Sequence, residues 1–271
     1  IANILARCFS SLPLGDLVFR LNVFSALCGA GAVFYLFKLV TLLLYDAMSE
    51  EQLIVPQNED LPGEDRIVEE TPHARDAIDE INDSAHRMAM AGGVISAIVF
   101  AFSTPFWLAA TRFHYQTFET LLIIAVCYAL VHYWVVASMR ALAIAAILVG
   151  VGLIESTFFM VILPFALFCF VFAGYRHGHI STSFIALLVL YMAIGLSIAG
   201  AAQVMWVIST GGDFSVRAVM KVTQLWGQNQ LNGVLAILSR KGWLILLAEG
   251  VIPLLLAYAA RYPIAYTYFL S

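Results

Sequence analysis

Long runs of apolar residues, separated by short polar breaks, make up most of the chain. A membrane-spanning α-helix needs about 20 consecutive, mostly apolar residues. The runs are continuous rather than alternating, which excludes a transmembrane β-barrel. The pattern therefore predicts an all-α fold, a polytopic transmembrane helical bundle of about seven spans. The expected spans are 22–45, 88–110, 118–137, a pair that divides residues 141–175, 183–208 and 243–260.

The run from Ala141 to Tyr175 is too long for one helix across about 30 Å of hydrocarbon. Polar residues and glycines lie near its middle, around Glu155. We therefore expect two spans that meet at a tight turn at Glu155, with Pro164 inside the second span.

Composition agrees with a membrane protein, because 62% of the 271 residues are hydrophobic, only 12% are charged, and the mean hydropathy is +0.89. A soluble domain carries about twice that share of charge. We expect a single transmembrane bundle over residues 1–271. Because the chain opens at Ile1 rather than at a methionine, we also expect it to be a fragment of a longer protein.

One segment, residues 46–87, carries most of the negative charge. It holds 13 of the 18 acidic residues and three of the 14 basic ones, so its net charge is −10, whereas the rest of the chain carries +6. We expect an acidic, partly disordered cytoplasmic loop here, with a surface helix at about 72–87 that Thr71 caps and Pro72 begins. The segment lacks the D-x-D-x-D-G pattern of a calcium-binding loop, so no metal site is predicted. Basic residues nowhere form a cluster of five, so no nucleic-acid partner is expected.

Two amphipathic segments flank the spans. Residues 1–21 are broken by Pro13 and Gly15 and are expected to approach the membrane along its surface. Residues 209–242 alternate apolar and basic faces at helical spacing. They predict two interfacial amphipathic helices that meet near Gly227.

The polar turn between the second and third predicted spans concentrates hydrophilic chemistry in eight positions. Arg112, His114, Tyr115, Gln116 and Glu119 supply a cation, an imidazole, a phenol, an amide and a carboxylate. Polar groups so close to hydrocarbon cost several kcal/mol unless they find partners or line a wet cavity. We interpret the turn as the rim of a membrane-embedded site. The alternative is an interfacial belt that only anchors helix ends among lipid headgroups.

Other candidate residues lie further along the chain. Glu155 and Glu249 are carboxylates within apolar runs, and Arg217 and Lys221 are cations of the amphipathic segment. Placing the acidic loop in the cytoplasm puts seven of the 11 basic residues outside that loop on the opposite side, against the positive-inside rule. Our hypothesis is that such cations bind an anionic ligand.

Three stretches resemble a known family, namely SLPLGDLVFRLNVFSALCGA, VFAFSTPFWLAATRFHYQTFETLL and GVGLIESTFFMVILPFAL. They are similar to signatures of bacterial membrane proteins of unknown function that are related to the transmembrane protein O-mannosyltransferases of the GT-C glycosyltransferase superfamily. His114 and Gln116 stand where that family usually has Glu and Tyr, and Glu155–Ser156 replace its Asn–His pair. The residues that match its patterns are Arg20, Asn22, Ser25, Ser103, Phe106, Trp107 and Thr117.

The resemblance implies a GT-C-like enzyme of the bacterial inner membrane. Such enzymes move a sugar from a polyprenyl-phosphate donor to an extracytoplasmic acceptor, which can be a protein. The expected partners are thus membrane lipid, the lipid-linked sugar and a possible protein acceptor, with no further cofactor. The family's catalytic acid lies in a loop that would precede Ile1, so no catalytic residue is assigned in this chain. The implied topology puts Arg112, His114 and residues 209–241 on the catalytic side, where Arg112, Arg217 and Lys221 suit a lipid phosphate.

Two other function classes stay open. In a transporter or flippase-like bundle, Glu155 and Glu249 would flank broken helices as ion or substrate sites. In a noncatalytic subunit of a membrane complex, the acidic loop would dock a soluble partner.

Overall fold

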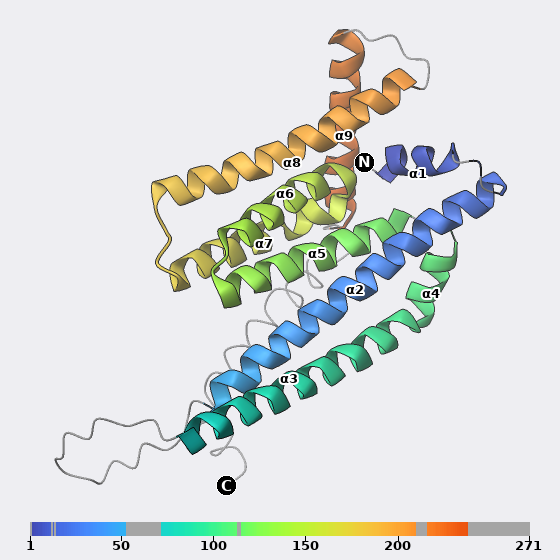
Figure 1. The fold of residues 1–271 in the computed structure, drawn as a ribbon. Coiled ribbons are helices and arrows are strands. Elements are labelled where there is room, and N and C mark those ends of the chain that lie inside the picture. The colour runs from blue at the N-terminus through green and yellow to red at the C-terminus, as the bar shows by residue number, and fades with distance from the viewer. Residues whose placement is uncertain are drawn as a thin grey trace. The chain divides into compact units, whose positions relative to one another are not determined.

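The computed structural model describes residues 2–11, 13, 15–52, 72–112, 115–209 and 216–237, and every regular element within these ranges is an α-helix (Figure 1). Five of these helices, α2, α3, α5, α7 and α8, are long and apolar enough to cross a membrane. The predicted polytopic helical bundle is therefore confirmed. The helices are α1 (Ala2–Ser10), α2 (Leu17–Gln52), α3 (Pro72–Ala101), α4 (Thr104–Thr111), α5 (Tyr115–Val136), α6 (Met139–Glu155), α7 (Thr157–Arg176), α8 (Thr182–Ser209) and α9 (Val216–Ile237).

The segments suited to span a membrane follow the hydropathy closely. They are Leu17–Met48, Asp83–Ala101, Gln116–Val136, Thr157–Arg176 and Thr182–Met205. The predicted fourth span corresponds to α6, which is not among these five, because its 17 residues reach only about 25 Å at 1.5 Å per residue. The predicted span at 243–260 lies outside the described residues.

The chain divides into two compact units, residues 2–148 and the residues from Val149 onward, which we call the N-terminal and the C-terminal unit. In the N-terminal unit α2 is the central helix, because it packs against α1, α3, α4 and α5. Figure 1 shows α2 (blue) between α3 (teal) and α5 (green). Small residues permit this close packing. A Cβ added to Gly31 of α2, for example, would lie 3.1 Å from Leu121 Cδ1 of α5.

The loop between α1 and α2 breaks at Pro13 and Gly15, as predicted, with Gly15 at a φ of +56°. Asp16 then begins α2, because its Oδ1 accepts a hydrogen bond from the Phe19 amide at 2.7 Å. The helix starts at Leu17 rather than at Asn22 and continues to Gln52. Residues 46–52, which were expected to be disordered, are thus the last turns of α2.

The second predicted span was wrong at its C-terminal end. Helix α3 is continuous from Pro72, through the expected surface helix, but stops at Ala101 instead of Ala110. A proline at position 105 cannot donate to the carbonyl of Ala101, and its ring clashes with that group. The backbone therefore breaks at Phe102 and Ser103, and α4 begins as a separate helix with its proline in the first turn. Asp83 and Arg87, four residues apart, form an ion pair at 3.2 Å on the exposed surface of α3.

In the C-terminal unit, α6 and α7 meet at one residue. Helix α6 ends at Glu155 and α7 begins at Thr157, which confirms the predicted tight turn. Ser156 between them is extended, at φ −141° and ψ 133°, and its side chain accepts from the Phe158 amide. Pro164 lies inside α7, as expected.

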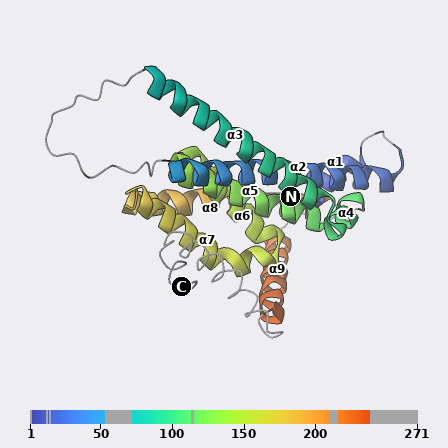
Figure 2. The same cartoon turned by 90° about the horizontal axis from the view of Figure 1, so that it is seen from below.

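Helix α9 contacts α7 and crosses the direction of α7 and α8 in both views (Figures 1 and 2). The prediction of two helices that meet at Gly227 was wrong, because α9 is one helix with Gly227 in its interior. A single helical glycine costs only about 1 kcal/mol, and the docking of α9 through Trp226, Gln230 and Gly233 offsets that cost.

The two glycines of α9 should respond oppositely to alanine. Among the described atoms none lies within 4 Å of a Cβ added at Gly227, whereas a Cβ at Gly233 would lie 2.8 Å from Thr157 Cγ2. We expect Gly227→Ala to raise the free energy of unfolding by up to about 1 kcal/mol. The matched Gly233→Ala should lower it. Thermal unfolding in detergent micelles measures both, and equal midpoints for the two variants would contradict the docking of α9.

Candidate functional site

The polar turn joins α4 to α5 in the N-terminal unit. Arg112 follows α4 in extended conformation, at φ −118° and ψ 144°, and its side chain is exposed. Gln116 is exposed in the first turn of α5, and Glu119 is half-buried one turn on. These three predicted residues thus lie within eight positions at the junction of α4 and α5. His114 and the side chain of Tyr115 lie outside the described residues.

A buried hydroxyl pair holds this turn in place. The Oγ of Ser25, on α2, lies 2.8 Å from Thr117 Oγ1 on α5. It also lies 2.9 Å from the carbonyl oxygen of Ala109 and 3.1 Å from that of Arg112. Ser25 is 0% and Thr117 1% exposed. One serine thus connects three helices of the N-terminal unit at the point where the polar turn begins and ends.

The donors and acceptors of this hydroxyl cluster balance. A hydroxyl carries one hydrogen and two lone pairs. Thr117 can donate to Ser25, and the Ser25 hydrogen then points at the two carbonyls of Ala109 and Arg112, which have no helical partner because α4 ends there. The stacked rings of Phe24 and Phe118, with centroids 6.4 Å apart, come from the residues next to the two hydroxyls and are themselves buried. A hydrogen bond shielded in this way is electrostatically stronger than one in water.

Arg20 performs a related task at the start of α2. Its guanidinium donates to the carbonyl of Ser10 at 2.5 Å and to that of Gly15 at 2.8 Å. Arg20 and Ser25 thus each hold a loop next to α2 by its backbone carbonyls. Arg20 and Ser25, which match the family pattern, therefore both donate hydrogen bonds to backbone carbonyls. The sequence did not show which carbonyls accept them.

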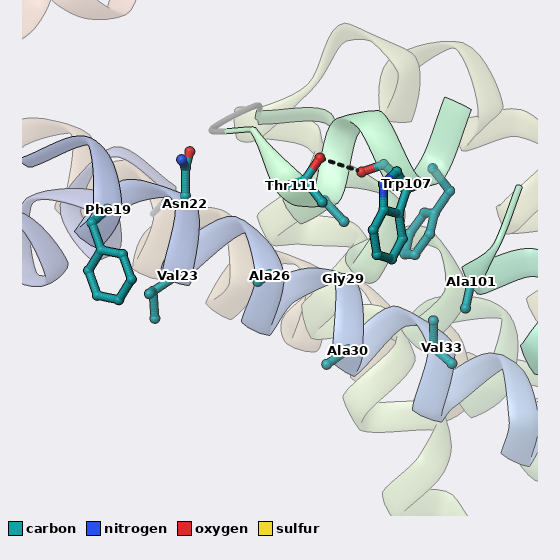
Figure 3. A pocket seen from close by; sticks show the side chains of 12 residues that line it. Phe19, Asn22, Val23, Ala26, Gly29, Ala30, Val33, Ala101, Trp107 and Thr111 are labelled. Carbon is teal, nitrogen blue, oxygen red and sulfur yellow. Dashed lines mark hydrogen bonds between the residues drawn. The ribbon is translucent and has the colours of Figure 1, made fainter. Parts of the chain in front are cut away.

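An apolar groove of about 490 Å³ lies between α2, α3 and α4 in the N-terminal unit. In Figure 3, Ala26, Ala30 and Val33 follow one another along α2, with Trp107 and Thr111 facing them from α4. The polar lining groups, Asn22 and Thr111, belong to the end that adjoins Arg112. The full lining is Phe19, Asn22, Val23, Ala26, Gly29, Ala30, Val33, Ala101, Phe106, Trp107, Ala110 and Thr111.

The C-terminal unit has its own polar junction at the α6–α7 turn. The carbonyl of Ile154 accepts from Trp226 Nε1 at 3.1 Å and from Gln230 Nε2 at 3.4 Å. The hydroxyl of Thr157 donates to Gln230 Oε1 at 2.5 Å. Helix α9 is thereby fastened to the turn beside the half-buried Glu155.

The remaining predicted site residues are placed only in part. Arg217 and Lys221 lie on the first turns of α9, but their side chains are outside the described residues, as is Glu249. Arg112, Gln116 and Glu119 belong to one compact unit, and Glu155 belongs to the other. In the part of the chain that the structure describes, no three His, Cys, Asp or Glu residues gather as metal ligands would.

Sequence reasoning missed the docking residues Trp226 and Gln230. They lie four residues apart, and Gly233 follows three residues later, so all three share one face of α9. The spacing of Trp226, Gln230 and Gly233 was the available signal for a helix face that packs against another element. The expectation of a helix break at Gly227 concealed it.

Ser25→Ala should destabilise the N-terminal unit. The substitution removes the donor to the part-buried carbonyls of Ala109 and Arg112 and the buried hydrogen bond to Thr117, which costs about 1–3 kcal/mol. Ser197→Ala is the matched control, because the Ser197 hydroxyl is exposed and bonds to the Ala193 carbonyl of its own helix at 2.8 Å. We expect a lower midpoint of thermal unfolding for the first variant and no change for the second. A stable Ser25→Ala protein would show that the hydroxyl cluster contributes nothing.

Comparison with known protein families gives a match over the first two thirds of the chain. Residues 1–179 match the model of the family described as the Protein O-mannosyl-transferase TMEM260 N-terminal domain. No curated protein and no solved structure matches the chain. The matched range contains the polar turn, the groove and the α6–α7 turn, whereas α9 lies after it.

Proposed function

Since the chain belongs to the family of the protein O-mannosyl-transferase TMEM260 N-terminal domain, we propose that it is part of a membrane glycosyltransferase that takes its sugar from a polyprenyl-phosphate donor. The family's name makes mannose the sugar to test first and a protein hydroxyl the acceptor to test first. The location proposed with it is the inner membrane of a bacterium, with the polar turn on the extracytoplasmic side and the acidic segment 46–87 in the cytoplasm.

The observation that carries this proposal beyond the family is the exposed Arg112 in a turn that a buried cluster holds in place. A polyprenyl-phosphate sugar presents its phosphate at the boundary of the hydrocarbon. A guanidinium binds phosphate through two parallel hydrogen bonds, which gives direction as well as charge. Because Ser25 fastens the carbonyl of Arg112 itself, the backbone of the cation is fixed before any ligand arrives. Preorganisation of this kind lowers the cost of binding.

The neighbouring groups suit the sugar beyond the phosphate. Gln116 and Glu119 lie on the first turns of α5, and an amide and a carboxylate can hydrogen-bond the hydroxyl groups of a hexose. The N-terminus of α5 adds the positive end of the helix dipole, which favours an anion. The turn therefore combines the two kinds of group that a phosphosugar needs.

Arg112 can be tested directly in the full-length protein. The assay follows labelled mannose from polyprenyl-phosphate mannose to a serine- or threonine-containing peptide in reconstituted membranes. Hydrogen bonds to charged groups contribute about 1.5–3 kcal/mol, so Arg112→Ala should raise the donor KM by about tenfold or more. Arg112→Lys should have a smaller effect, since it keeps the charge and loses the planar fork.

Arg87→Ala is the control, because Arg87 is an exposed arginine of α3 whose partner is Asp83. We expect its donor KM to be unchanged. A wild-type protein that transfers no mannose would contradict the proposed activity, and an unchanged KM in Arg112→Ala would contradict the phosphate site alone. Movement of the lipid-linked sugar across vesicles without transfer would instead favour the flippase-like class.

A further inference from the structure

The turn between α7 and α8, residues 177–181, connects two helices that are suited to span a membrane. Helix α7 has 20 residues and so reaches about 30 Å at 1.5 Å per residue, which matches the thickness of the hydrocarbon core. Its last residue, Arg176, therefore stands where the hydrocarbon gives way to the lipid headgroups. The turn that follows lies among these headgroups, at one end of the C-terminal unit.

This end of α7 is basic. The sequence from position 175 to position 181 is YRHGHIS, which contains one arginine, two histidines and no acidic residue. The side chain of Arg176 is exposed, and those of His177 and His179 are partly exposed. The two imidazole rings lie close together, with centroids 5.9 Å apart. A guanidinium and two imidazoles supply N–H donors for the oxygens of a phosphate.

The backbone holds these donors in a fixed turn. Gly178 has a φ of +65°, a conformation that favours glycine. The amides of Gly178 and His179 donate to carbonyls in the last turn of α7 at 3.0 and 2.9 Å, in the arrangement of a Schellman motif. At the start of α8, the Ser181 hydroxyl accepts from the Phe184 amide at 3.1 Å. The two imidazoles flank Gly178, so their positions are set before any ligand binds.

Exposed phenylalanines lie on the same face of α7, toward the membrane interior. The rings of Phe168 and Phe172 stack, with centroids 5.8 Å apart and planes 7° from parallel. The two residues are 47% and 42% exposed. Positions 168, 172 and 176 are four residues apart, so the stacked rings lead along the helix to Arg176. A row of basic groups above an exposed apolar surface matches the order of phosphate and acyl chain in a phospholipid.

We propose that the end of α7 and the turn after it bind an anionic phospholipid. The phosphate binds at Arg176, His177 and His179, and one acyl chain lies along Phe168 and Phe172. We call this surface the α7 lipid site. It is separate from the proposed sugar transfer, because it belongs to the C-terminal unit, whereas the polar turn and the groove beside it belong to the N-terminal unit.

The exposed rings favour a lipid over a free phosphate ion. A free phosphate contacts the basic turn alone. A phospholipid also covers Phe168 and Phe172, and dispersion contacts with its acyl chain add to the binding. Tyr175, one position before Arg176, is 74% exposed, and its amphipathic ring is of the kind that is enriched at the boundary between hydrocarbon and headgroups.

The basic turn favours an anionic headgroup over a zwitterionic one. A zwitterionic lipid carries an ammonium group next to its phosphate, and arginine and protonated histidine repel that ammonium. Phosphatidylglycerol has the same phosphate without the cation. The attraction of basic residues to anionic lipids acts close to the membrane surface, which is where this turn lies.

Lipid titration of the full-length protein tests the site. The protein in dodecyl maltoside micelles is titrated with phosphatidylglycerol or phosphatidylcholine, and native mass spectrometry counts the bound lipids. We expect the wild-type protein to bind phosphatidylglycerol at least about fivefold more tightly than phosphatidylcholine. Arg176→Gln should weaken phosphatidylglycerol binding about fivefold or more. Arg87→Gln is the control and should leave it unchanged, because Arg87 is an exposed arginine that pairs with Asp83.

The histidines give a second pair of variants, which keeps the test decisive if Arg176→Gln fails to fold. The double variant His177→Ala/His179→Ala should weaken phosphatidylglycerol binding about threefold. The control His86→Ala changes an exposed histidine of α3 and should have no effect.

The acyl-chain part of the site has its own pair of variants. Phe172→Ala should weaken phosphatidylglycerol binding about twofold, since it removes apolar contact area. Leu167→Ala is the control on the same helix. Leu167 is 37% exposed but lies five positions before Phe172, about 140° around the helix.

Competition separates a lipid from a free anion. Inorganic phosphate at the same concentration should not displace phosphatidylglycerol, because it has no acyl chain. Three results would overturn the proposal. They are equal binding of phosphatidylglycerol and phosphatidylcholine, wild-type binding of phosphatidylglycerol by both the Arg176→Gln and the double histidine variants, and displacement by inorganic phosphate. In the last case the turn binds a soluble anion.

Discussion

The last backbone carbonyls of a helix have no hydrogen-bond donor within the helix. Inside a membrane no water molecule takes the place of that donor. In this protein, side chains from neighbouring segments supply the missing donors. Ser25 serves the end of α4, Arg20 serves the loop between α1 and α2, and Trp226 with Gln230 serves the end of α6. Each of these three helix ends thus lies where a donor on another element meets it. The polar turn and the α6–α7 turn both follow from this requirement.

A break that is satisfied in this way can carry function. If α3 continued without a break, there would be no separate helix α4 packed against α2 and no turn that begins at Arg112. Because Pro105 ends α3 and the Ser25 hydroxyl holds the far end of α4, the chain turns at the exposed Arg112 and continues as α5. The hydrogen bonds from Ser25 to the carbonyls of Ala109 and Arg112 and the exposure of the Arg112 side chain therefore both follow from the way α4 ends.

Hydropathy predicted the spans and the turn at Glu155, because each depends on the length of an apolar run relative to the membrane. It did not predict the break at Ser103, because the largely apolar run continues past this point to Ala110, although Pro105 was a signal for a helix end. Gly227 was wrongly interpreted as a helix break. The low helix propensity of one glycine is a weak local preference, and the docking of α9 outweighs it. The contact between Ser25 and Thr117 joins residues 92 positions apart. One sequence contains no signal for such a pairing, although the family pattern marked both residues.

The position of Ser25 on α2 links the polar turn to the groove. Asn22, Ala26 and Gly29 line the groove from α2, and Ser25 lies between them on the adjoining face, where it holds the carbonyl of Ala109. Ala110, the next residue, is part of the groove's outer wall. Any shift of α2 relative to α4 would therefore change the width of the groove and the position of Arg112 together. One helix, α2, therefore bears on both the groove and the polar turn.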